Sequence, residues 1–381
     1  MNAVKKLIAD LVGHATVSDT SNLEIQNYIE AYLKFYGITV TRVYNDAGDK
    51  ANLYASIGPD VAGGVVLSGH TDVVPVVGQA WSSDPFKVVE KDDRLYGRGT
   101  CDMKSFLAIA LSLVPDMQAA NMKRPIHLAF SYDEEVGCLG APRMIDDMVA
   151  KLPPIDAVIV GEPTLLEIAN AHKGVRGYRF RFRGVEAHSS QPHRGVSAIE
   201  YATKLMAEIY EIRDELTAKP FTGTSFEPPY STLNVGMING GTAHNIIAKE
   251  CAFTVDYRYI PQDDRRAVID RIDLLVGKLS AAMQKDHPDA GIDVDIAEIP
   301  AFRAETDSNA EMLCRQLSGK NNTLNVSYGT EAGQFQERGY STIVCGPGSI
   351  DQAHKPDEYI ELEQVKKGVQ FIKSLINRQK N

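Results

Sequence analysis

Two glutamates, Glu134 and Glu135, stand side by side in the stretch SYDEEVG, directly after the apolar run of residues 126–130. Such a run is typical of a buried strand, so the pattern predicts two carboxylates where a strand ends. Successive strand residues point to opposite faces, and the two carboxylates therefore need not share one environment. One of them could hold a metal ion while the other moves a proton in general acid–base catalysis.

Other polar side chains also follow apolar runs. His70 closes the run VVLSG, and Asp72 could accept a hydrogen bond from the ring nitrogen of His70 that does not face a metal. Glu162 ends the run DAVIV, and Pro163 stops the strand there. A lone histidine at a strand end is most often only a polar terminus. Because sites in α/β proteins gather at strand ends, we nevertheless treat these junctions as parts of one candidate site.

Two further candidates lie outside strands. Asp102 follows two glycines and precedes a helical pattern from about Met103 to Ala120, so a helix N-cap explains it about as well as a metal does. His354 lies in the glycine- and proline-rich stretch GPGSIDQAHKPDEY. Two histidines with three carboxylates offer mixed nitrogen and oxygen donors, which suit zinc, cobalt or manganese better than calcium or magnesium. Five donors suit two metals that share one bridging carboxylate and clamp a water and a scissile carbonyl.

The segments that must position these residues show two different sequence patterns. Apolar runs alternate with helical patterns up to about residue 174, which predicts α/β layering around a largely buried sheet. Residues 178–183 then alternate aromatic residues with arginine, as in an antiparallel sheet with one wet face. We therefore predict an α/β domain of residues 1–174 and 291–381 that is interrupted by an inserted α+β domain of residues 175–290.

Composition excludes several classes of protein. The 381 residues carry 40 basic and 50 acidic side chains, and this net charge of −10 makes nucleic acid and anionic membrane poor partners. The 5 cysteines lack CxxC spacing, which argues against a disulfide framework or a thiolate zinc cluster. Residues 1–14 show the spacing of a helix face rather than a signal peptide, and no apolar run reaches membrane-spanning length. We expect a reducing, cytoplasmic location.

The motifs HTDVVP, YGRGTCDMK, DEEVG, GEPT and AHKPDEY resemble, in this order and over essentially the whole chain, the M20 family of dinuclear zinc metallopeptidases and deacylases. Within the family, HTDVVPVVGQAWSSDPF, RLYGRGTCDMKSF, SYGTEAGQF and GPGSIDQAHKPDEY most resemble the acetylornithine deacetylases. That resemblance implies hydrolysis of N2-acetyl-L-ornithine to ornithine and acetate, a step of arginine biosynthesis. It also implies a three-layer zinc-peptidase-like catalytic domain, an inserted lid and dimerisation domain, two divalent metal ions (zinc or cobalt), a small N-acyl amino acid substrate and a homodimer.

The resemblance implies a role for each matching residue. The implied metal ligands are His70 and Glu162 on one metal, Glu135 and His354 on the other, and Asp102 as the bridge between them. Asp72 matches the partner of the first histidine, and Glu134 matches the general base. The peptide bond from Asp102 to Met103 is cis in the family. The adjacent glutamates would thus divide metal binding and proton transfer between them.

The inserted domain also carries matching residues. His188, in EAHSS, matches a histidine that reaches the active site of the partner subunit and donates a hydrogen bond to the oxyanion. Asn245, in GGTAHNII, and Arg258, in VDYRYIP, match positions that hold the carboxylate end of the substrate. An arginine fork suits a carboxylate because it can bind both oxygens at once. Gly329 and Thr330 match a loop that contacts the substrate.

Other members of the family remain as alternatives. A succinyl-diaminopimelate desuccinylase, a general N-acyl-amino-acid deacylase and a dipeptidase would share the metal ligands and differ in the specificity loops. The desuccinylase usually has GTSDG where this chain has GTEAG, which favours the deacetylase, and Glu331 of this stretch is a candidate partner for a substrate ammonium group. A non-catalytic relative that only binds is the rival of a different class, but it would have no need of a general base.

Overall fold

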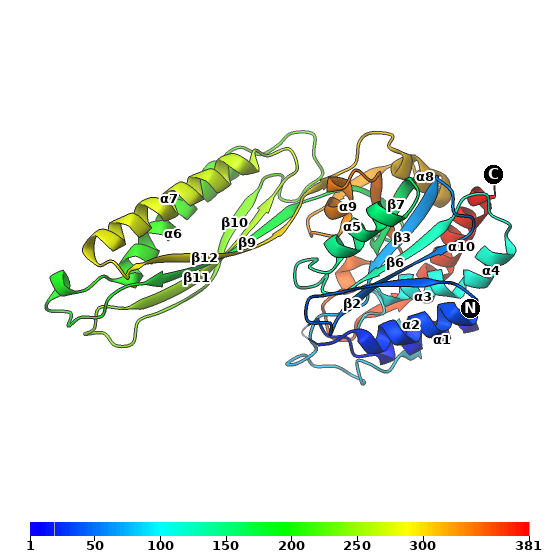
Figure 1. Ribbon diagram of the computed structural model, residues 1–381, viewed down its shortest axis with the longest axis horizontal. Helices are drawn as coiled ribbons and strands as arrows, with labels where there is room; N and C mark the ends of the chain where they lie inside the picture. Colours follow the sequence, from blue (N-terminus) through cyan, green and yellow to red (C-terminus); the bar gives the residue numbers. More distant parts are fainter. Residues whose placement is uncertain (19, 381) are drawn as a thin grey trace. The chain divides into compact units, whose positions relative to one another are not determined.

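The computed structural model describes residues 1–18 and 20–380 of the chain. The chain divides into two compact units, which Figure 1 shows as a ribbon coloured along the sequence. Unit 1 consists of Met1–Ala171, Phe302–Leu324 and Thr330–Asn381, and unit 2 consists of His172–Ala301 and Asn325–Gly329. The chain therefore leaves unit 1 to build most of unit 2, returns, and passes briefly through unit 2 a second time at residues 325–329.

The point of return differs from the predicted residue 291. Strand β12 (Gly291–Ile299) pairs along its whole length with β9 (Gly174–Arg183), which is the first strand of unit 2. Hydrogen bonds of the sheet thus keep these residues in unit 2, and Phe302 is the first residue back in unit 1. The predicted boundary lies just before this strand, and the pairing of β12 with β9 moves it to the end of the strand.

Unit 1 is built on a nine-stranded mixed sheet whose strands follow the order β1-β2-β6-β3-β7-β15-β8-β13, with β14 paired to β8. In that order the strands are Val40–Tyr44, Ala51–Ile57, Ile126–Ser131, Gly64–His70, Ile155–Pro163, Thr342–Gly346, Ile168–His172 and Phe302–Arg303, and β14 is Thr323–Val326. The four central strands β6, β3, β7 and β15 run parallel to one another. A small separate sheet consists of β4 (Val89–Lys91), β5 (Arg94–Tyr96) and β16 (Tyr359–Glu361).

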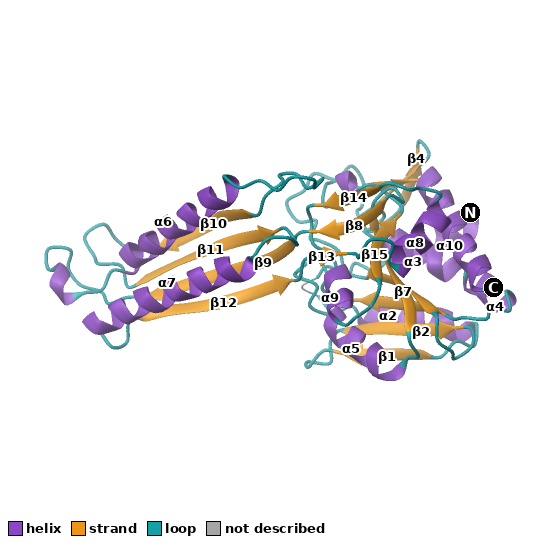
Figure 2. Ribbon diagram, turned by 90° about the horizontal axis from the view of Figure 1, so that it is seen from above, coloured by secondary structure: helices purple, strands orange, loops and turns teal. Residues whose placement is uncertain are grey.

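Helices cover both faces of the large sheet, as Figures 1 and 2 show. One layer contains α1 (Asn2–Gly13), α2 (Leu23–Phe35), α3 (Lys104–Ser112), α4 (Val114–Ala119), α8 (Asn309–Ser318) and α10 (Leu362–Gln379), and the other contains α5 (Ala141–Lys151) and α9 (Ala332–Glu337). The central strands are buried because both faces are covered, which explains their continuous apolar runs. The predicted three-layer α/β class is confirmed.

The helix predicted from Met103 to Ala120 is broken in two. Helix α3 ends at Ser112, and α4 begins at Val114 with Pro115 in its first turn. Proline has no N–H to donate, and its ring would clash with the carbonyl of Leu111 in a continuous helix. The first turn of a new helix is the position that tolerates proline, so the apolar periodicity continues across a real break.

Unit 2 is a four-stranded antiparallel sheet with one helical face. The strand order is β10-β11-β9-β12, where β10 is Thr232–Gly240 and β11 is Glu250–Tyr259. Helices α6 (Ala198–Thr217) and α7 (Arg265–Asp286) lie side by side across one face, as Figure 2 shows. Along β9, Tyr178, Phe180 and Phe182 are buried under these helices while the arginines between them are not. The alternation predicted for this strand is confirmed.

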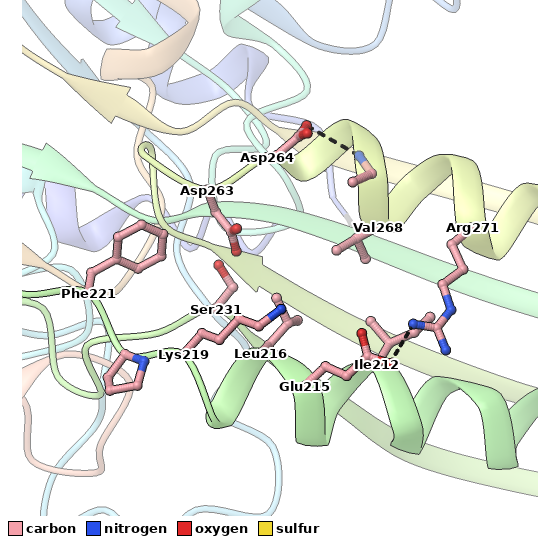
Figure 3. Close-up of a pocket in the computed structure, with 12 residues that line it drawn as sticks. Ile212, Glu215, Leu216, Lys219, Phe221, Ser231, Asp263, Asp264, Val268 and Arg271 are labelled. Carbon is pink, nitrogen blue, oxygen red and sulfur yellow. Dashed lines mark hydrogen bonds and ion pairs between the residues drawn. The ribbon is translucent and has the colours of Figure 1, made fainter.

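A pocket of about 480 Å³ opens between the end of α6 and the start of α7 (Figure 3). Its walls combine apolar Ile212 and Leu216 with charged Lys219 and Asp263. The side chain of Asp264 caps α7 beside it by accepting the N–H of residue 267. None of the residues predicted to act in catalysis lines this pocket.

The structure also shows the state of the cysteines and the character of the helices. All five cysteines lie within the described part of the chain, and each is a buried, unpaired thiol. Among the helices of residues 1–18 and 20–380, none has the length and apolar character that crossing a bilayer requires.

One buried histidine makes the stability of unit 1 sensitive to acid. His127, on the central strand β6, is 2% exposed, and its Nδ1 lies 2.8 Å from Oγ of Ser56. Burial lowers the pKa of His127 from 6.5 to about 4, because the charged ring would lose its hydration. The unfolded chain takes up this proton below pH 6.5 and the folded chain does not. The contribution to stability is therefore present above pH 6.5 and is lost as the pH falls toward 4.

Replacing His127 with Gln should flatten this dependence, since an amide can still meet Ser56 and does not titrate. Between pH 7 and pH 5 the free energy of unfolding of the wild type should fall by about 2 kcal/mol more than that of His127→Gln. Urea denaturation of both proteins at the two pH values measures this difference. Because the two proteins share every other titrating group, parallel losses would show that His127 is protonated in the folded state.

Candidate metal centre and active site

The candidate site lies at the carboxyl ends of the four parallel strands of unit 1. Strand β3 ends at His70, and β7 carries Glu162 next to its last residue. Strand β6 ends at Ser131, just before the adjacent glutamates, and β15 ends at Gly346, before the loop that holds His354. Parallel neighbouring strands bring their carboxyl ends to one edge of the sheet, so side chains from four distant segments converge there.

The five predicted ligands form two groups that share one carboxylate. Ligand atoms of His70, Asp102 and Glu162 lie within 4.8 Å of one another, and so do those of Asp102, Glu135 and His354. Oδ1 of Asp102 lies 3.1 Å from Nε2 of His70, and Oδ2 of Asp102 lies 3.4 Å from Nε2 of His354. Each oxygen of one carboxylate thus faces a different histidine. This geometry is that of a bridging carboxylate between two cations.

The alternative explanation of Asp102 as a helix cap is wrong. Residue Met103 occupies the N-cap of α3, and no side chain makes a capping hydrogen bond there. The carboxylate of Asp102 is buried and turned to the two histidines instead. The peptide bond between Asp102 and Met103 is cis, as the family resemblance implied.

Glycines let α3 approach the strands that carry the ligands. A Cβ on Gly69, just before His70, would lie 2.6 Å from Cε of Met103. A Cβ on Gly161, just before Glu162, would lie 2.2 Å from the ring of Phe106. The start of α3 follows Asp102 directly, so this close packing fixes the distance between the bridging carboxylate and the two strand ends.

Asp72 meets His70 through its backbone as well as its carboxylate. Nδ1 of His70 lies 2.9 Å from the backbone carbonyl oxygen of Asp72, whereas the carboxylate oxygen is 3.5 Å away. Since a carbonyl only accepts, Nδ1 carries the hydrogen and Nε2 faces the ligand group with its lone pair. The predicted choice of tautomer therefore holds, but the backbone of Asp72 makes the closer contact.

The carboxylate of Asp72 holds the adjacent glutamates. Its two oxygens accept the backbone N–H of Glu134 at 3.1 Å and of Glu135 at 3.2 Å, and Ser18 donates a further hydrogen bond at 2.7 Å. These glutamates lie in the loop after β6 rather than on the strand. The different directions of the two glutamate side chains therefore come from a turn and not from a strand. Asp72 fixes the backbone of that turn.

The adjacent side chains then diverge. Oε2 of Glu135 lies 2.9 Å from Nε2 of His354 and so joins the second ligand group. Glu134 joins neither group, and its Oε1 lies 3.3 Å from Sγ of Cys138. One glutamate is therefore positioned as a ligand and the other is left beside the cluster.

The electrostatics of the cluster indicate a cation site. Burial, followed by the repulsion of neighbouring carboxylates, raises the pKa of Glu134 and Glu162 well above the usual range. Hydrogen bonds to Asp102 and Glu135 raise the pKa of His354 to about 10. In the protein alone, positive charge on the imidazole is what satisfies the carboxylates. Divalent cations would supply that charge and leave the histidines neutral, so the donor set fits metal ions.

A glutamate that the sequence interpretation left without a role supports the bridge. Oε1 of Glu358 accepts the backbone N–H groups of Cys101 at 2.8 Å and Asp102 at 3.1 Å. Its Oε2 lies 2.7 Å from the guanidinium of Arg98, and both side chains are 1% exposed. The motif AHKPDEY contains Glu358, but its contact partners lie more than two hundred positions earlier, which no local pattern reveals.

The stretch YGTEAGQF divides between the two units. Thr330 is buried in unit 1, and Gly329 belongs to unit 2. Both carboxylate oxygens of Glu331 accept hydrogen bonds from serines, Oε1 from Ser131 and Oε2 from Ser68 at 3.3 Å. Glu331 therefore ties the ends of β3 and β6 together, and this engagement disfavours its candidate role as partner of a substrate ammonium group.

Three further predicted residues lie in unit 2. Nδ1 of His188 accepts the backbone N–H of Ser190 at 3.1 Å, so Nε2 carries the hydrogen in the neutral ring and can donate it. Asn245 lies beside it, where its carbonyl accepts the N–H of residue 189 at 3.0 Å. Arg258, on β11, pairs through Nε with Asp256 at 2.9 Å.

Solved structures share this fold. An M20 family metallo-carboxypeptidase from Sulfolobus solfataricus aligns with a TM-score of 0.78 at 18% identity over 100% of this chain and 99% of that one. An aminopeptidase from Bacillus cereus ATCC 10987 gives 0.76 at 18% identity over 100% and 99% of the two chains. A dinuclear metal-binding peptidase of the M20 family from Bacillus subtilis gives 0.68 at 14% identity over 100% and 98%. The fold is that of M20 peptidases.

The sequence relationship goes further than the fold. The profile of peptidase family M20/M25/M40 matches residues 66–378, and the chain therefore belongs to this family and is a hydrolase. Two curated relatives, from Klebsiella pneumoniae (strain 342) and Shigella sonnei (strain Ss046), are each 35% identical over 94% of this chain and 91% of their own length. Both relatives are named acetylornithine deacetylase.

Proposed function

We propose that the protein is a metal-dependent amidohydrolase that removes the acetyl group from N2-acetyl-L-ornithine, yielding ornithine and acetate for arginine biosynthesis in the cytoplasm. The observation that carries the chemistry is the divergence of Glu134 and Glu135, one beside the ligand groups and one within them. The relatives named acetylornithine deacetylase support the choice of substrate.

Two divalent metal ions complete the proposed site. His70 and Glu162 would hold one ion, and Glu135 and His354 would hold the other, with Asp102 shared between them. Mixed imidazole and carboxylate donors favour zinc or cobalt. Bound there, the ions would polarise the amide carbonyl and acidify the attacking water.

The protein's own groups move the proton. Glu134 accepts a proton from the attacking water as the water adds to the carbonyl carbon. Glu134 then delivers the proton to the amine nitrogen as the amide bond breaks. His188 is proposed to donate its Nε2 hydrogen to the developing oxyanion, and Arg258 with Asn245 to bind the substrate carboxylate. Gly329 and Thr330 complete the proposed substrate contacts.

A substrate screen tests the proposed activity. The protein, loaded with zinc or cobalt, should release acetate from N2-acetyl-L-ornithine faster than it hydrolyses N-succinyl-diaminopimelate, other N-acyl amino acids or dipeptides. Preference for one of the latter would assign the chain to that activity of the family. Stoichiometric metal without hydrolysis of any of them would identify a binding protein.

The first prediction from this proposed function separates the adjacent glutamates. Glu134→Ala should lower kcat by roughly 10²- to 10⁴-fold while about two metal ions per chain remain, because general acid–base catalysis contributes a factor of that size. Glu135→Ala should lose metal as well as activity. Metal analysis and acetate release on both variants check this, and equal metal loss in the two would contradict the division of roles.

The second prediction concerns the substrate carboxylate. Converting it to an amide should weaken binding by about 1.5–3 kcal/mol, the size expected for a hydrogen bond between charged groups. Arg258→Ala should abolish this discrimination between acid and amide. Arg181→Ala is the matched control, because Arg181 lies on the same sheet and pairs with Asp295. Kinetics of both substrates with the three proteins decide it, and discrimination that survives in Arg258→Ala would exclude the carboxylate clamp.

We also propose that unit 2 is a lid and dimerisation unit and that the active protein is a homodimer. Strand β10 is an edge of the sheet, and its Met237 and Ile238 are 62% and 51% exposed. An exposed edge strand with apolar side chains offers unpaired N–H and C=O groups to a second chain. In a two-fold symmetric dimer, the β10 edge of each chain would be covered by the β10 edge of the other.

Mixed dimers test whether His188 serves the partner subunit. Glu134→Ala and His188→Ala homodimers should each be nearly inactive. Co-expression makes half of the dimers mixed, and in each of these one site keeps both residues, so activity should recover to roughly a quarter of wild type. Acetate release by the co-expressed mixture measures it. Background activity alone would mean that His188 acts within its own chain or not at all.

A further inference from the structure

We propose that Cys138 is a positioning residue for proton transfer: its thiol holds Oε1 of Glu134 and thereby makes Oε2 the oxygen that moves the proton. This inference rests on the proposed role of Glu134 as the base. Sγ of Cys138 lies 3.3 Å from Oε1 of Glu134. The cysteine is fully buried, in a stretch where Val136 and Leu139 are 50% and 56% exposed.

The thiol is the donor in this contact. Burial, and next the charge of Glu134, raise the pKa of Cys138 well above its ordinary value. The sulfur therefore keeps its hydrogen at neutral pH, and a carboxylate without its proton can only accept. An S–H donor is weak, but the sulfur of Cys138 is fully buried, and a hydrogen bond shielded from water on that side favours one orientation of the carboxylate.

The backbone is bent to bring the thiol to this position. Asp133 and Cys138 have φ angles of 55° and 54°, which residues other than glycine adopt rarely. Between them, the carbonyl of Glu134 accepts the N–H groups of Gly137 at 3.0 Å and Cys138 at 2.8 Å. The resulting tight turn returns the chain so that residue 138 faces residue 134. Such strained conformations persist where the surroundings hold them, and they gather at functional sites.

Contacts from other segments hold both ends of the turn. Asp72 accepts the N–H of Glu134 at 3.1 Å, and Gln334, on α9, donates from Nε2 to the carbonyl of Cys138 at 2.9 Å. The backbone of the base is thus fixed, and what remains is rotation of its side chain. The thiol acts on this remaining freedom.

The two oxygens of Glu134 then have separate tasks. Oε1 accepts the thiol hydrogen throughout, and the S–H bond does not break. Oε2 forms the new O–H bond when water loses its proton, and that O–H bond breaks when the proton passes to the amine nitrogen. A carboxylate anchored in this way does not have to exchange its oxygens between the two transfers, so less reorganisation is needed in each cycle.

Three substitutions test the proposal. Cys138→Gly and Cys138→Ala remove the donor, and both should lower kcat roughly fivefold to tenfold with KM and metal content unchanged, about the effect of one lost hydrogen bond. Glycine suits the positive φ at this position, so Cys138→Gly keeps the test valid if Cys138→Ala folds poorly. Cys138→Ser restores a donor and should recover most of kcat.

A double-variant cycle separates positioning from general stability. In the Glu134→Ala background, Cys138→Gly should cause no further loss of kcat, because the thiol acts only through that carboxylate. Cys314→Ala is the control for loss of a buried thiol, since Cys314 is equally buried, lies on α8 and interacts with the thiol of Cys345. It should leave kcat unchanged.

The outcomes distinguish the positioning role of Cys138 from the proposed role of Glu134 as the base. If Glu134→Ala keeps wild-type kcat, the proposed base is wrong and the inference falls with it. If Glu134→Ala is inactive but Cys138→Gly and Cys138→Ala match wild type, the base stands and the positioning role is excluded. A loss in Cys138→Gly that Ser does not restore, or that recurs in full in the Glu134→Ala background, would assign Cys138 to packing alone.

Discussion

Asp102 offers one carboxylate oxygen to each of two histidines, and unit 1 is arranged to keep it there. The carboxylate is buried, so its charge is costly unless it is compensated on both sides. His70 comes from a strand end and His354 from a loop after another strand, while Glu358 fixes the backbone of Asp102 from behind. Each contact joins segments that are separated in the sequence. The parallel strands bring these segments together because their carboxyl ends lie at one edge of the sheet.

Many elements of the fold could be predicted because the period and the length of an apolar pattern indicate whether a segment forms a strand or a helix. The buried strands of unit 1 read as apolar runs, and β9 in unit 2 reads as an alternation of aromatic residues and arginine. The break before Pro115 was missed because apolar spacing continues through it. The return of the chain was placed before β12 because a strand's sheet is decided by its hydrogen-bonding partner, which lies more than a hundred residues away.

The site was predictable to the extent that local motifs carry it. The candidate ligands were found from strand ends and family motifs, and they do meet in space. The contacts that orient them were not found. Glu358 reaches Asp102 across the chain, and the carboxylate of Asp72 holds the backbone of two glutamates in addition to facing the ring of His70. Orientation of this kind depends on contacts between segments that are far apart in the chain, and a local sequence pattern does not encode such contacts.

The discontinuity of unit 1 has a consequence for synthesis. The ribosome delivers His70, Asp102, Glu135 and Glu162 before the residues of unit 2, and it delivers His354 and Glu358 after them. Strand β15, which is central in the large sheet, also emerges late. A nascent chain therefore holds a partial set of donors and an unfinished sheet through most of its translation. On the proposed assignment of ligands, the second metal position is therefore complete only after His354 has been synthesised.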